Sequence, residues 1–186
     1  MALELIEEHL NGLKLFKAQK FEDERGYFIE AYKSSDLLKH NIKENFLQDN
    51  HSKSKRGVLR GMHFQWDKPQ GKLIRVISGK IQIAETDIRK HSATLGQFWT
   101  GVLSEYNSLV LWVPPGFANA FLVLEDNTHV VYKCTEEFNP KGESGIRWND
   151  PQINIPWQIT NPELSQKDAN ALTLDQWLKR EESHYF

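Results

Sequence analysis

Short runs of β-branched, aromatic and aliphatic residues alternate with turn signals along most of the chain. The runs that predict strands are Tyr27–Tyr32, Leu73–Ile77, Ile81–Thr86, Phe98–Leu103, Leu109–Val113, Phe121–Leu124 and Val130–Cys134. Pairs and clusters rich in Gly, Pro, Asn and Asp separate them, as turns require. Because little helical periodicity interrupts residues 12–145, the pattern predicts an all-β sandwich or barrel.

Two of the turn signals make specific predictions about the strands beside them. The sequence Val76-Ile77-Ser78-Gly79-Lys80-Ile81 is typical of a tight hairpin. The sequence Pro114-Pro115-Gly116 should stop the strand that ends at Val113, because proline has no backbone N–H to donate to a sheet. We therefore expect the strands on either side of Gly79 to pair and the chain to turn after Val113.

Helix signals are confined to the edges of this pattern. Residues Ser34–Leu38 predict a short helix with a serine hydroxyl as its cap. The sequence Thr173-Leu174-Asp175-Gln176 has the spacing of a capping box, and Leu174 and Trp177 fall on one helical face. Three prolines between these helices, at 151, 156 and 162, indicate an irregular segment that wraps over the sheet.

The composition is that of a folded protein with no general affinity for polyanions. Of 186 residues, 39% are hydrophobic, and 6 Trp, 5 Tyr and 10 Phe provide enough bulk for a core. The 23 Lys and Arg and the 25 Asp and Glu give a net charge of −2, which argues against a nucleic-acid binder. No internal repeat or linker is visible, so we expect a single domain over residues 1–186.

Cysteine content and hydropathy bear on the compartment. The single cysteine, Cys134, excludes an intrachain disulfide framework and any zinc site with two or more thiolates, so a reducing compartment is expected. No signal or transit peptide is visible, and no run approaches the roughly 20 apolar residues of a membrane span. These features predict a cytoplasmic protein without membrane association.

Positive charge is concentrated between His51 and Arg75. Seven basic residues and one acid, Asp67, give this segment a charge of +6. The exposed lysines in it need no role beyond solvation. Arg60 and Lys72 differ, because apolar residues and turns flank them and a strand could carry either side chain into the barrel. An interior that presents Arg and Lys would suit a small anionic ligand.

His63 lies in the same segment, and from the residues alone it is a packing residue, a catalytic base or a metal ligand. Small β-barrels often hold a metal on an H-x-H pair followed by a glutamate and a later histidine. Here the pair reads His63-Phe64-Gln65, and the later position, in G-F-A-N-A-F, is Asn119. Both replacements remove imidazole ligands, so we expect chemistry without a metal.

Eight separated blocks of sequence follow one another from about Gly12 to Trp177. They read F-E-D-E-R-G-Y-F, Q-D-N-H-S-K-S-K-R-G-V-L-R-G-M-H-F-Q, Q-G-K-L-I-R-V, D-I-R-K-H-S-A-T-L-G-Q-F, L-W-V-P-P-G-F-A-N-A-F-L-V-L, V-V-Y-K-C-T, G-I-R-W-N-D-P and E-L-S-Q-K-D-A. Together they resemble the dTDP-4-dehydrorhamnose 3,5-epimerase family. The resemblance implies a cupin-type jelly-roll β-sandwich or barrel with short flanking helices. It also implies a homodimer that works without a metal or an organic cofactor.

The family resemblance further implies a reaction in dTDP-L-rhamnose biosynthesis and a role for four residues. The reaction inverts C3 and C5 of dTDP-4-dehydro-6-deoxy-D-glucose and gives dTDP-4-dehydro-β-L-rhamnose. A proton beside the C4 ketone is acidic because its loss gives an enolate, so inversion needs a base, a cation or donor at the ketone oxygen, and an acid on the opposite face. By resemblance His63 is the base and Asp168 its partner. Lys72 matches the group that stabilises the enolate oxygen, and Tyr132 matches the acid.

The same resemblance implies a binding site for a small molecule, the dTDP-sugar. Its residues are expected to be Arg25, Glu30, Gln48, Asp49, Asn50, Arg60, Asn119, Phe138, Glu143 and Lys167. Arg25 and Arg60 would be natural partners of the diphosphate, and Arg25 and Glu30 could serve the neighbouring subunit of the dimer. Asn119 departs from the family pattern, which usually has histidine there. An asparagine can hydrogen-bond a hydroxyl or a ketone, but it cannot relay a proton.

Two alternatives to this function remain at the level of sequence. The first is an epimerase that inverts only C3 or only C5 of a related nucleotide-4-ketosugar. The second is a non-catalytic cupin that binds a carbohydrate. The joint presence of His63, Lys72, Tyr132 and Asp168 argues against the second, because a binding module needs neither a base nor an opposed acid.

Overall fold

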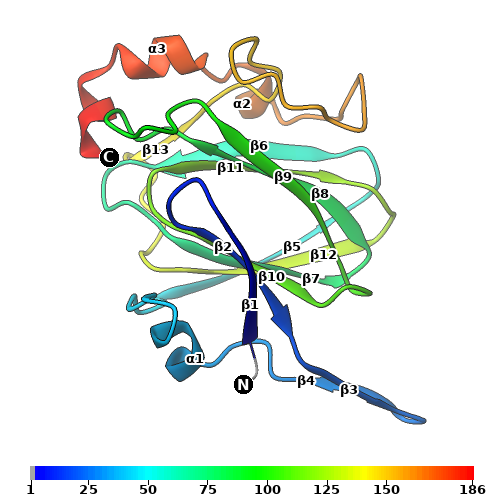
Figure 1. Ribbon diagram of the computed structural model, residues 1–186. Coiled ribbons are helices and arrows are strands. Elements are labelled where there is room, and N and C mark those ends of the chain that lie inside the picture. Colours follow the sequence, from blue (N-terminus) through cyan, green and yellow to red (C-terminus); the bar gives the residue numbers. More distant parts are fainter. Residues whose placement is uncertain (1–2) are drawn as a thin grey trace.

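Two antiparallel sheets packed face to face form the body of the protein (Figure 1). The computed structural model describes residues 3–186. The first sheet has, in spatial order, the strands β1 (Leu3–His9), β2 (Leu13–Ala18), β10 (Leu109–Val113), β7 (Lys72–Ser78), β12 (Thr128–Cys134) and β5 (Gln48–Ser54). The second has β13 (Glu143–Gly145), β6 (Leu59–Gln65), β11 (Phe117–Val123), β8 (Lys80–Asp87) and β9 (Phe98–Ser104). The prediction of an all-β sandwich is confirmed.

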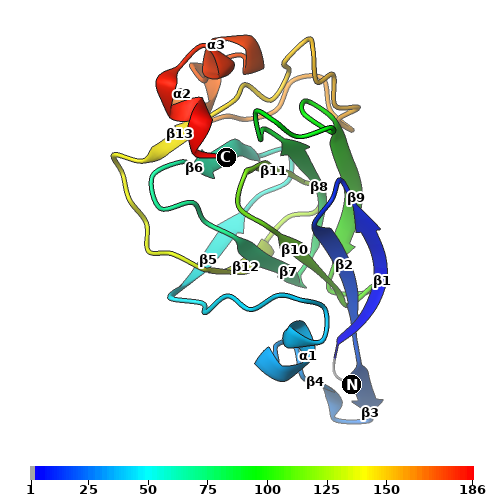
Figure 2. The same ribbon diagram turned by 60° about the vertical axis from the view of Figure 1, so that its left-hand side comes forward.

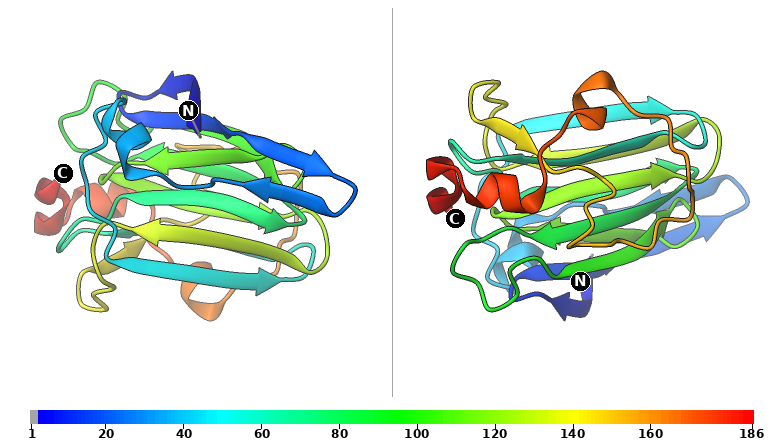
Figure 3. Two further views of the ribbon diagram at one scale, coloured as in Figure 1. Left: turned by 90° about the horizontal axis from the view of Figure 1, so that it is seen from below. Right: turned by 90° about the horizontal axis from the view of Figure 1, so that it is seen from above.

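Short elements flank the sandwich. The hairpin of β3 (Lys20–Asp23) and β4 (Gly26–Ile29) projects beyond the six-stranded sheet, as Figures 1 and 3 show. The helices are α1 (Ser34–Leu38), α2 (Gln166–Ala169), α3 (Leu174–Leu178) and the 3₁₀ helix η1 (Glu181–Tyr185). Figure 2 shows α1 below the six-stranded sheet and α2 and α3 above the five-stranded sheet. No helix of residues 3–186 is both long and apolar enough to span a bilayer.

Most predicted strands are confirmed, with longer bounds than the sequence pattern suggested. The strand Leu109–Val113 is β10, and it ends where the Pro-Pro-Gly turn predicts. The run Tyr27–Tyr32 is only partly a strand, because β4 ends at Ile29. The predicted set lacked β1, β2, β3, β5, β6 and β13. Strand β5, Gln48–Ser54, is entirely polar, and it is held by its ladder with β12 rather than by apolar side chains of its own.

The predicted hairpin at Gly79 is wrong. Strands β7 and β8, which flank this residue, belong to different sheets, so the chain turns a corner between the sheets there. Gly79 has a positive φ of 80°, a conformation that favours glycine. A side chain at this position would also collide with Thr128. The same turn signal therefore fits both a hairpin and a corner, and the packing of the two sheets decides between them.

The two predicted helix starts have different outcomes. Helix α1 spans Ser34–Leu38 as predicted, but its N-cap is Lys33, and no side chain caps it, so the expected serine cap is wrong. At α3 the capping box is present: the Thr173 hydroxyl accepts from the backbone N–H of Gln176, whose side chain accepts from the Thr173 N–H.

Apolar residues fill three layers. The layer between the sheets is aliphatic, as Ile74, Ile83 and Leu111 illustrate. A second layer lies outside the five-stranded sheet, on the face that the irregular segment predicted from the prolines and helix α3 cover (Figure 3, right). In this layer the buried Trp177 of α3 packs against Phe64. The third lies under α1 on the outer face of the six-stranded sheet. The irregular cover matters for function, because α2 lies within it.

Candidate active site

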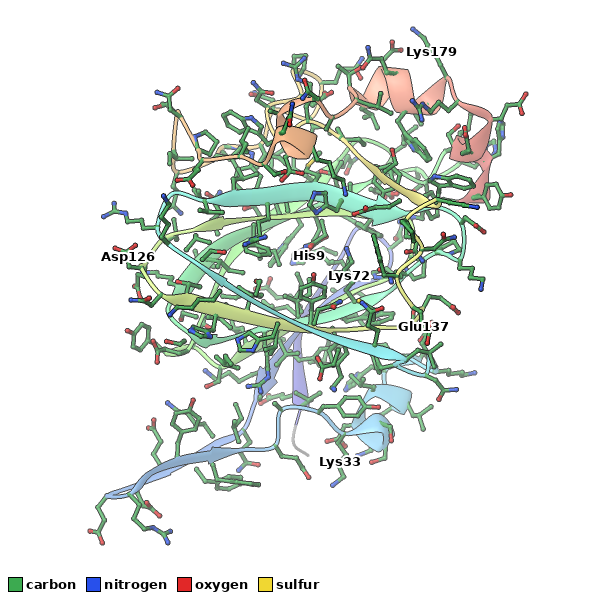
Figure 4. All side chains as sticks on the ribbon, turned by 180° about the vertical axis from the view of Figure 1, so that it is seen from behind. His9, Lys33, Lys72, Asp126, Glu137 and Lys179 are labelled. Atoms are coloured by element: carbon green, nitrogen blue, oxygen red, sulfur yellow. The ribbon has the colours of Figure 1, made fainter. Side chains whose placement is uncertain are left out.

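The interior between the sheets changes character from one part to another. Successive inward positions of a strand are two residues apart, so Ile81 and Ile83 of β8, which pack in the core, are followed on the same face by Glu85. We define the apolar end of the interior by Ile74, Val76, Ile81, Ile83, Phe121 and Val130. We define the polar end by His63, Lys72, Glu85, Asn119, Tyr132 and Cys134. Figure 4 shows Lys72 between the two sheets.

Strand pairing brings the polar end together across both sheets. In the five-stranded sheet, Asn119 of β11 is paired with His63 of β6 on one side and with Glu85 of β8 on the other. In the six-stranded sheet, Cys134 of β12 is paired with Lys72 of β7. Two walls therefore face each other, with the imidazole on one and the amine on the other.

A histidine and a carboxylate form the shortest ionisable contact of the polar end. His63 Nε2 lies 2.5 Å from Oδ1 of Asp168, which is only 4% exposed. Asp168 is placed by α2, where the N-cap hydroxyl of Ser165 accepts from the Asp168 backbone N–H. The predicted pairing of His63 and Asp168 is thus present in the structure, across a sequence separation of 105 residues.

The environment of Asp168 keeps its carboxylate charged. Burial raises the pKa of Asp168, but hydrogen bonds from His63, Ser165 and the Gly61 backbone, together with attraction to His63, lower it below its ordinary value overall. An ionised carboxylate accepts a hydrogen bond, so it fixes the proton of His63 on Nε2 and leaves the lone pair on Nδ1. His63 keeps access to solvent, because its side chain is 30% exposed and it lines surface depressions of about 190 and 330 Å³, whereas Asp168 is buried.

The side chains of the six-stranded sheet that face His63 are less exposed to solvent. Lys72 is 9% exposed, and burial lowers the pKa of its ammonium group, while Cys134, Glu85 and Glu143 act in the other direction. Tyr132 faces the same interior, and burial raises the pKa of its phenol. Lys72 is therefore a cation that gives up its proton more readily than a free lysine, whereas Tyr132 holds its proton more firmly than a free tyrosine.

Glu85 is the residue of the polar end that sequence reasoning missed. It is fully buried, and burial raises the pKa of its carboxyl group well above the ordinary value. Asn119 Nδ2 donates a hydrogen bond to its Oε1. A signal for it was present, because the predicted strand Ile81–Thr86 places an acid on the same face as two isoleucines.

Several predicted binding residues gather at the open rim of the polar end. Glu143 of β13 forms an ion pair of 2.5 Å with Lys167 of α2. On β5, Gln48 Nε2 donates to Asn50 Oδ1 at 3.0 Å, and Asn50 Nδ2 lies 3.5 Å from Cys134 Sγ. These contacts tie both sheets and α2 to the same opening.

Arg60 lies at this opening with its side chain exposed. Its Nε donates to Ser54 Oγ at 3.1 Å, and it lies close enough to Tyr132 to oppose the rise in the pKa of that phenol. The interior position considered for Arg60 from the sequence is therefore wrong, whereas Lys72 is inside.

Four predicted site residues do not join the polar end within one chain. Asp49 lies on the outer face of β5, where it pairs with Lys133 at 3.0 Å. Arg25 is at the tip of the projecting hairpin and bonds Asp23, while Glu30 follows β4. Phe138 is 54% exposed.

The described residues also bear on metal binding. Within residues 3–186, no group of three or more His, Cys, Asp or Glu side chains gathers in a way that would hold a metal ion. His63 has a carboxylate as its neighbour, and Asn119 occupies the place of a further imidazole.

Comparison with known proteins gives a consistent result. Residues 7–176 match the sequence model of the family described as dTDP-4-dehydrorhamnose 3,5-epimerase. The chain is 46% identical over 169 residues to the dTDP-4-dehydrorhamnose 3,5-epimerase of Methanothermobacter thermautotrophicus, covering 89% of this chain and 91% of the relative.

Two solved structures extend the comparison. The dTDP-6-deoxy-D-glucose-3,5-epimerase of Legionella pneumophila, crystallised with dTDP-4-keto-L-rhamnose, has a TM-score of 0.93 and 37% identity, with 97% of this chain and 96% of that chain covered. A 3'-monoepimerase from Streptomyces bikiniensis, crystallised with dTDP-quinovose, has a TM-score of 0.82 and 27% identity, with coverage of 88% and 84%.

Proposed function

The chain belongs to the dTDP-4-dehydrorhamnose 3,5-epimerase family, and on this premise we propose how its residues carry out the reaction. The protein is a cupin-type isomerase that epimerises C3 and C5 of dTDP-4-dehydro-6-deoxy-D-glucose in dTDP-L-rhamnose biosynthesis. The observation that carries the assignment of roles is the opposition of His63 and Tyr132. His63 lies on β6 of the five-stranded sheet and Tyr132 on β12 of the six-stranded sheet, which supports roles on opposite faces of the substrate.

His63 is the base in this proposal. Its Nδ1 carries the lone pair when Nε2 donates to Asp168, so Nδ1 takes the proton from the carbon beside the C4 ketone. The imidazolium that forms is stabilised by the Asp168 carboxylate, which remains ionised because its pKa is lowered. The electron pair of the broken C–H bond moves into the C3–C4 or C4–C5 bond, and the ketone becomes an enolate.

Lys72 stabilises that enolate. A buried ammonium group acts on a developing negative charge more strongly than an exposed one, because the surroundings screen it less. The lowered pKa of Lys72 also means that an approaching negative charge restores its preference for the charged form. Lys72 thus stabilises the reacting sugar most strongly when negative charge develops on the enolate oxygen.

Tyr132 is the acid in this proposal. Its phenol stands on the wall opposite His63, and its raised pKa keeps it protonated at neutral pH. Transfer of this proton to the enolate carbon, from the face opposite the one that lost its proton, inverts the centre and leaves a phenolate. Exchange with solvent through the open rim then returns a proton to Tyr132 and removes one from His63.

The rim residues provide the binding site for the nucleotide sugar. Arg60 meets the diphosphate, and Gln48, Asn50, Glu143 and Lys167 contact the sugar and its linkage. Arg25 and Glu30 are remote from His63 in their own chain, and their hairpin exposes Phe21 and Phe28. We therefore infer a homodimer in which this hairpin reaches the site of the partner subunit.

The remaining parts of the proposal are the roles of Asp49 and Phe138 and the location of the protein in the cell. Asp49 lies on the outer face of β5 and acts on the site through its neighbours Gln48 and Asn50. Phe138 donates its backbone N–H to Gln48 Oε1 at 2.8 Å, which supports a place beside the base of the nucleotide. The site as proposed uses neither a metal nor an organic cofactor, and the buried thiol of Cys134 suits the reducing cytoplasm.

The test is solvent exchange in heavy water. Incubation of the protein with dTDP-4-dehydro-6-deoxy-D-glucose should introduce deuterium at both C3 and C5, as read by NMR. Label at only one carbon would indicate a single-centre epimerase. The absence of label at both carbons, with dTDP binding intact, would indicate a carbohydrate-binding cupin without catalytic activity.

A further inference from the structure

Glu85 is a buried acid that the proposed mechanism leaves without a task. It is 0% exposed and lies on the same face of β8 as the core residues Ile81 and Ile83. Acids are almost never fully buried without a partner, because removing a carboxyl group from water is costly. A strand that served packing alone would continue with an aliphatic side chain at this position.

One oxygen of Glu85 has a partner and the other has none. Oε1 accepts a hydrogen bond from Asn119 Nδ2, while Oε2 is buried and unpaired among the residues that the structure describes. Burial raises the pKa of this carboxyl and so favours the neutral acid, although Lys72 acts in the opposite direction. The neutral form places its proton on Oε2 and keeps Oε1 as an acceptor, so the bond to Asn119 exists in either protonation state.

The partner of Glu85 stands between it and the proposed base. Asn119 is paired with Glu85 on one side and with His63 on the other, and it is partly exposed, whereas Glu85 is sealed. The amide group of asparagine is planar, so an Nδ2 directed at Glu85 turns Oδ1 away from it. Asn119 then presents a hydrogen-bond acceptor on the His63 side.

We propose that Glu85 is a positioning residue that fixes the amide of Asn119, so that Asn119 Oδ1 accepts a hydrogen bond from a ring hydroxyl of the nucleotide sugar beside the carbon that His63 deprotonates. This inference rests on the proposed function of the site. Without Glu85, the amide has two orientations and Nδ2 loses its buried partner. Substrate binding then bears the cost of ordering the amide.

A matched pair of variants tests the acceptor role. Glu85→Gln keeps an oxygen for Asn119, whereas Glu85→Leu keeps the bulk and removes the acceptor. We expect Glu85→Gln to stay within about threefold of the wild-type kcat/KM, and Glu85→Leu to lose about tenfold, mainly through a higher KM. Glu85→Leu kinetics equal to the wild type would overturn the proposal, and so would equal losses in the two variants.

A double-mutant cycle separates positioning from a general structural effect. If Glu85 acts through Asn119, then Glu85→Leu should add nothing to Asn119→Ala. Losses that multiply would show that Glu85 acts by another route and would refute the inference. Affinity for dTDP, measured by calorimetry, should be unchanged in every variant, because the nucleotide does not contact Glu85.

Two further measurements keep the inference testable. If Glu85→Leu does not fold, the side-chain amide NMR signal of Asn119, assigned by its loss in Asn119→Ala, should show slow solvent exchange in the wild type and in Glu85→Gln. Fast exchange in both would refute the proposal. A wild type that fails to exchange substrate protons would instead contradict the proposed function, whatever the amide signal shows.

Discussion

The two ends of the sandwich interior are built on the same strands and do opposite things. At the apolar end, Ile74 of one sheet and Ile83 of the other are almost completely buried in aliphatic surroundings. Two residues away on the same strands, Lys72 is 9% exposed and Glu85 is fully buried, but both carry ionisable groups. The apolar end lowers the free energy of the folded state, while the polar end holds ionisable groups whose burial raises that free energy.

The magnitudes show why both ends are needed. Full burial of an isoleucine contributes about 1.5–3 kcal/mol to stability. Burial of an isolated charge costs several kcal/mol. The apolar end therefore supplies the stability that lets the polar end keep Lys72 and Glu85 away from water. A substitution at the polar end should therefore lower turnover more than stability. A substitution at the apolar end should lower the free energy of unfolding and leave the kcat of the folded protein nearly unchanged.

The largest expected effect on turnover follows from His63→Ala. Removal of the base should lower kcat about a thousandfold, because general base catalysis contributes factors of this size. The affinity for dTDP should stay close to that of the wild type. Turnover that is unchanged would remove His63 from the mechanism, and a loss of dTDP binding would place it in the binding site instead.

Tyr132→Phe should have the next largest effect on turnover, and it should slow inversion more than it slows the exchange of substrate protons with solvent. The phenyl ring keeps the packing but has no proton to donate, so inversion should fall about a hundredfold. Exchange of substrate protons with heavy water, which His63 can perform from its own face, should fall much less. Equal losses of exchange and inversion would show that the tyrosine is mainly structural.

Lys72→Arg should have a smaller effect at neutral pH, about tenfold, because a guanidinium does not reproduce the geometry of an ammonium. Burial lowers the pKa of Lys72 below 10.5, so its charge is present at low pH and is lost, as pH rises, earlier than in a free lysine. The wild-type activity should therefore decline on the alkaline side below pH 10.5, and arginine, which stays charged, should remove that decline.

The matched control for this pH profile is Tyr132→Phe. The raised pKa of Tyr132 keeps the phenol protonated above pH 10, so the alkaline decline should persist in that variant at its lower activity. A decline that disappears in Tyr132→Phe and persists in Lys72→Arg would reverse the assignment.

Ile83→Ala tests the apolar end and should have the smallest effect on turnover. The cavity should lower the free energy of unfolding by about 2–5 kcal/mol. The kcat of the folded fraction should stay within about twofold of the wild type, because additivity holds between sites that share no partners. Chemical denaturation gives the first quantity, and kinetics at low temperature give the second. A large loss of kcat would show that the two ends are mechanically coupled.

Sequence reasoning predicted β7 to β12 and part of β4 from runs of apolar residues, but it missed six strands, among them β2 and β6, which also carry apolar residues. Strand β5 was missed because it has no apolar residue and depends on its neighbour β12. The turn at Gly79 was misassigned because local signals do not say which sheet the next strand joins. Both errors concern long-range pairing, which no short window of sequence contains.

The candidate site shows the same division. Lys72 could be recognised from its apolar flanks, and the roles of His63 and Tyr132 came from the family resemblance. The contact between His63 and Asp168 joins residues 105 positions apart, so its geometry needed the fold. Glu85 was not identified, because the prediction of the strand Ile81–Thr86 did not assign its residues to the two faces of the sheet.

The position of Asp168 in the chain determines when during synthesis the base His63 can gain its partner. The last strand of the sandwich ends at Gly145, and Asp168 follows it, on a short helix in the irregular cover. During synthesis, both sheets leave the ribosome before the partner of the base does. The base therefore gains its carboxylate only after every strand of the sandwich has been made, so catalytic competence depends on the docking of the cover.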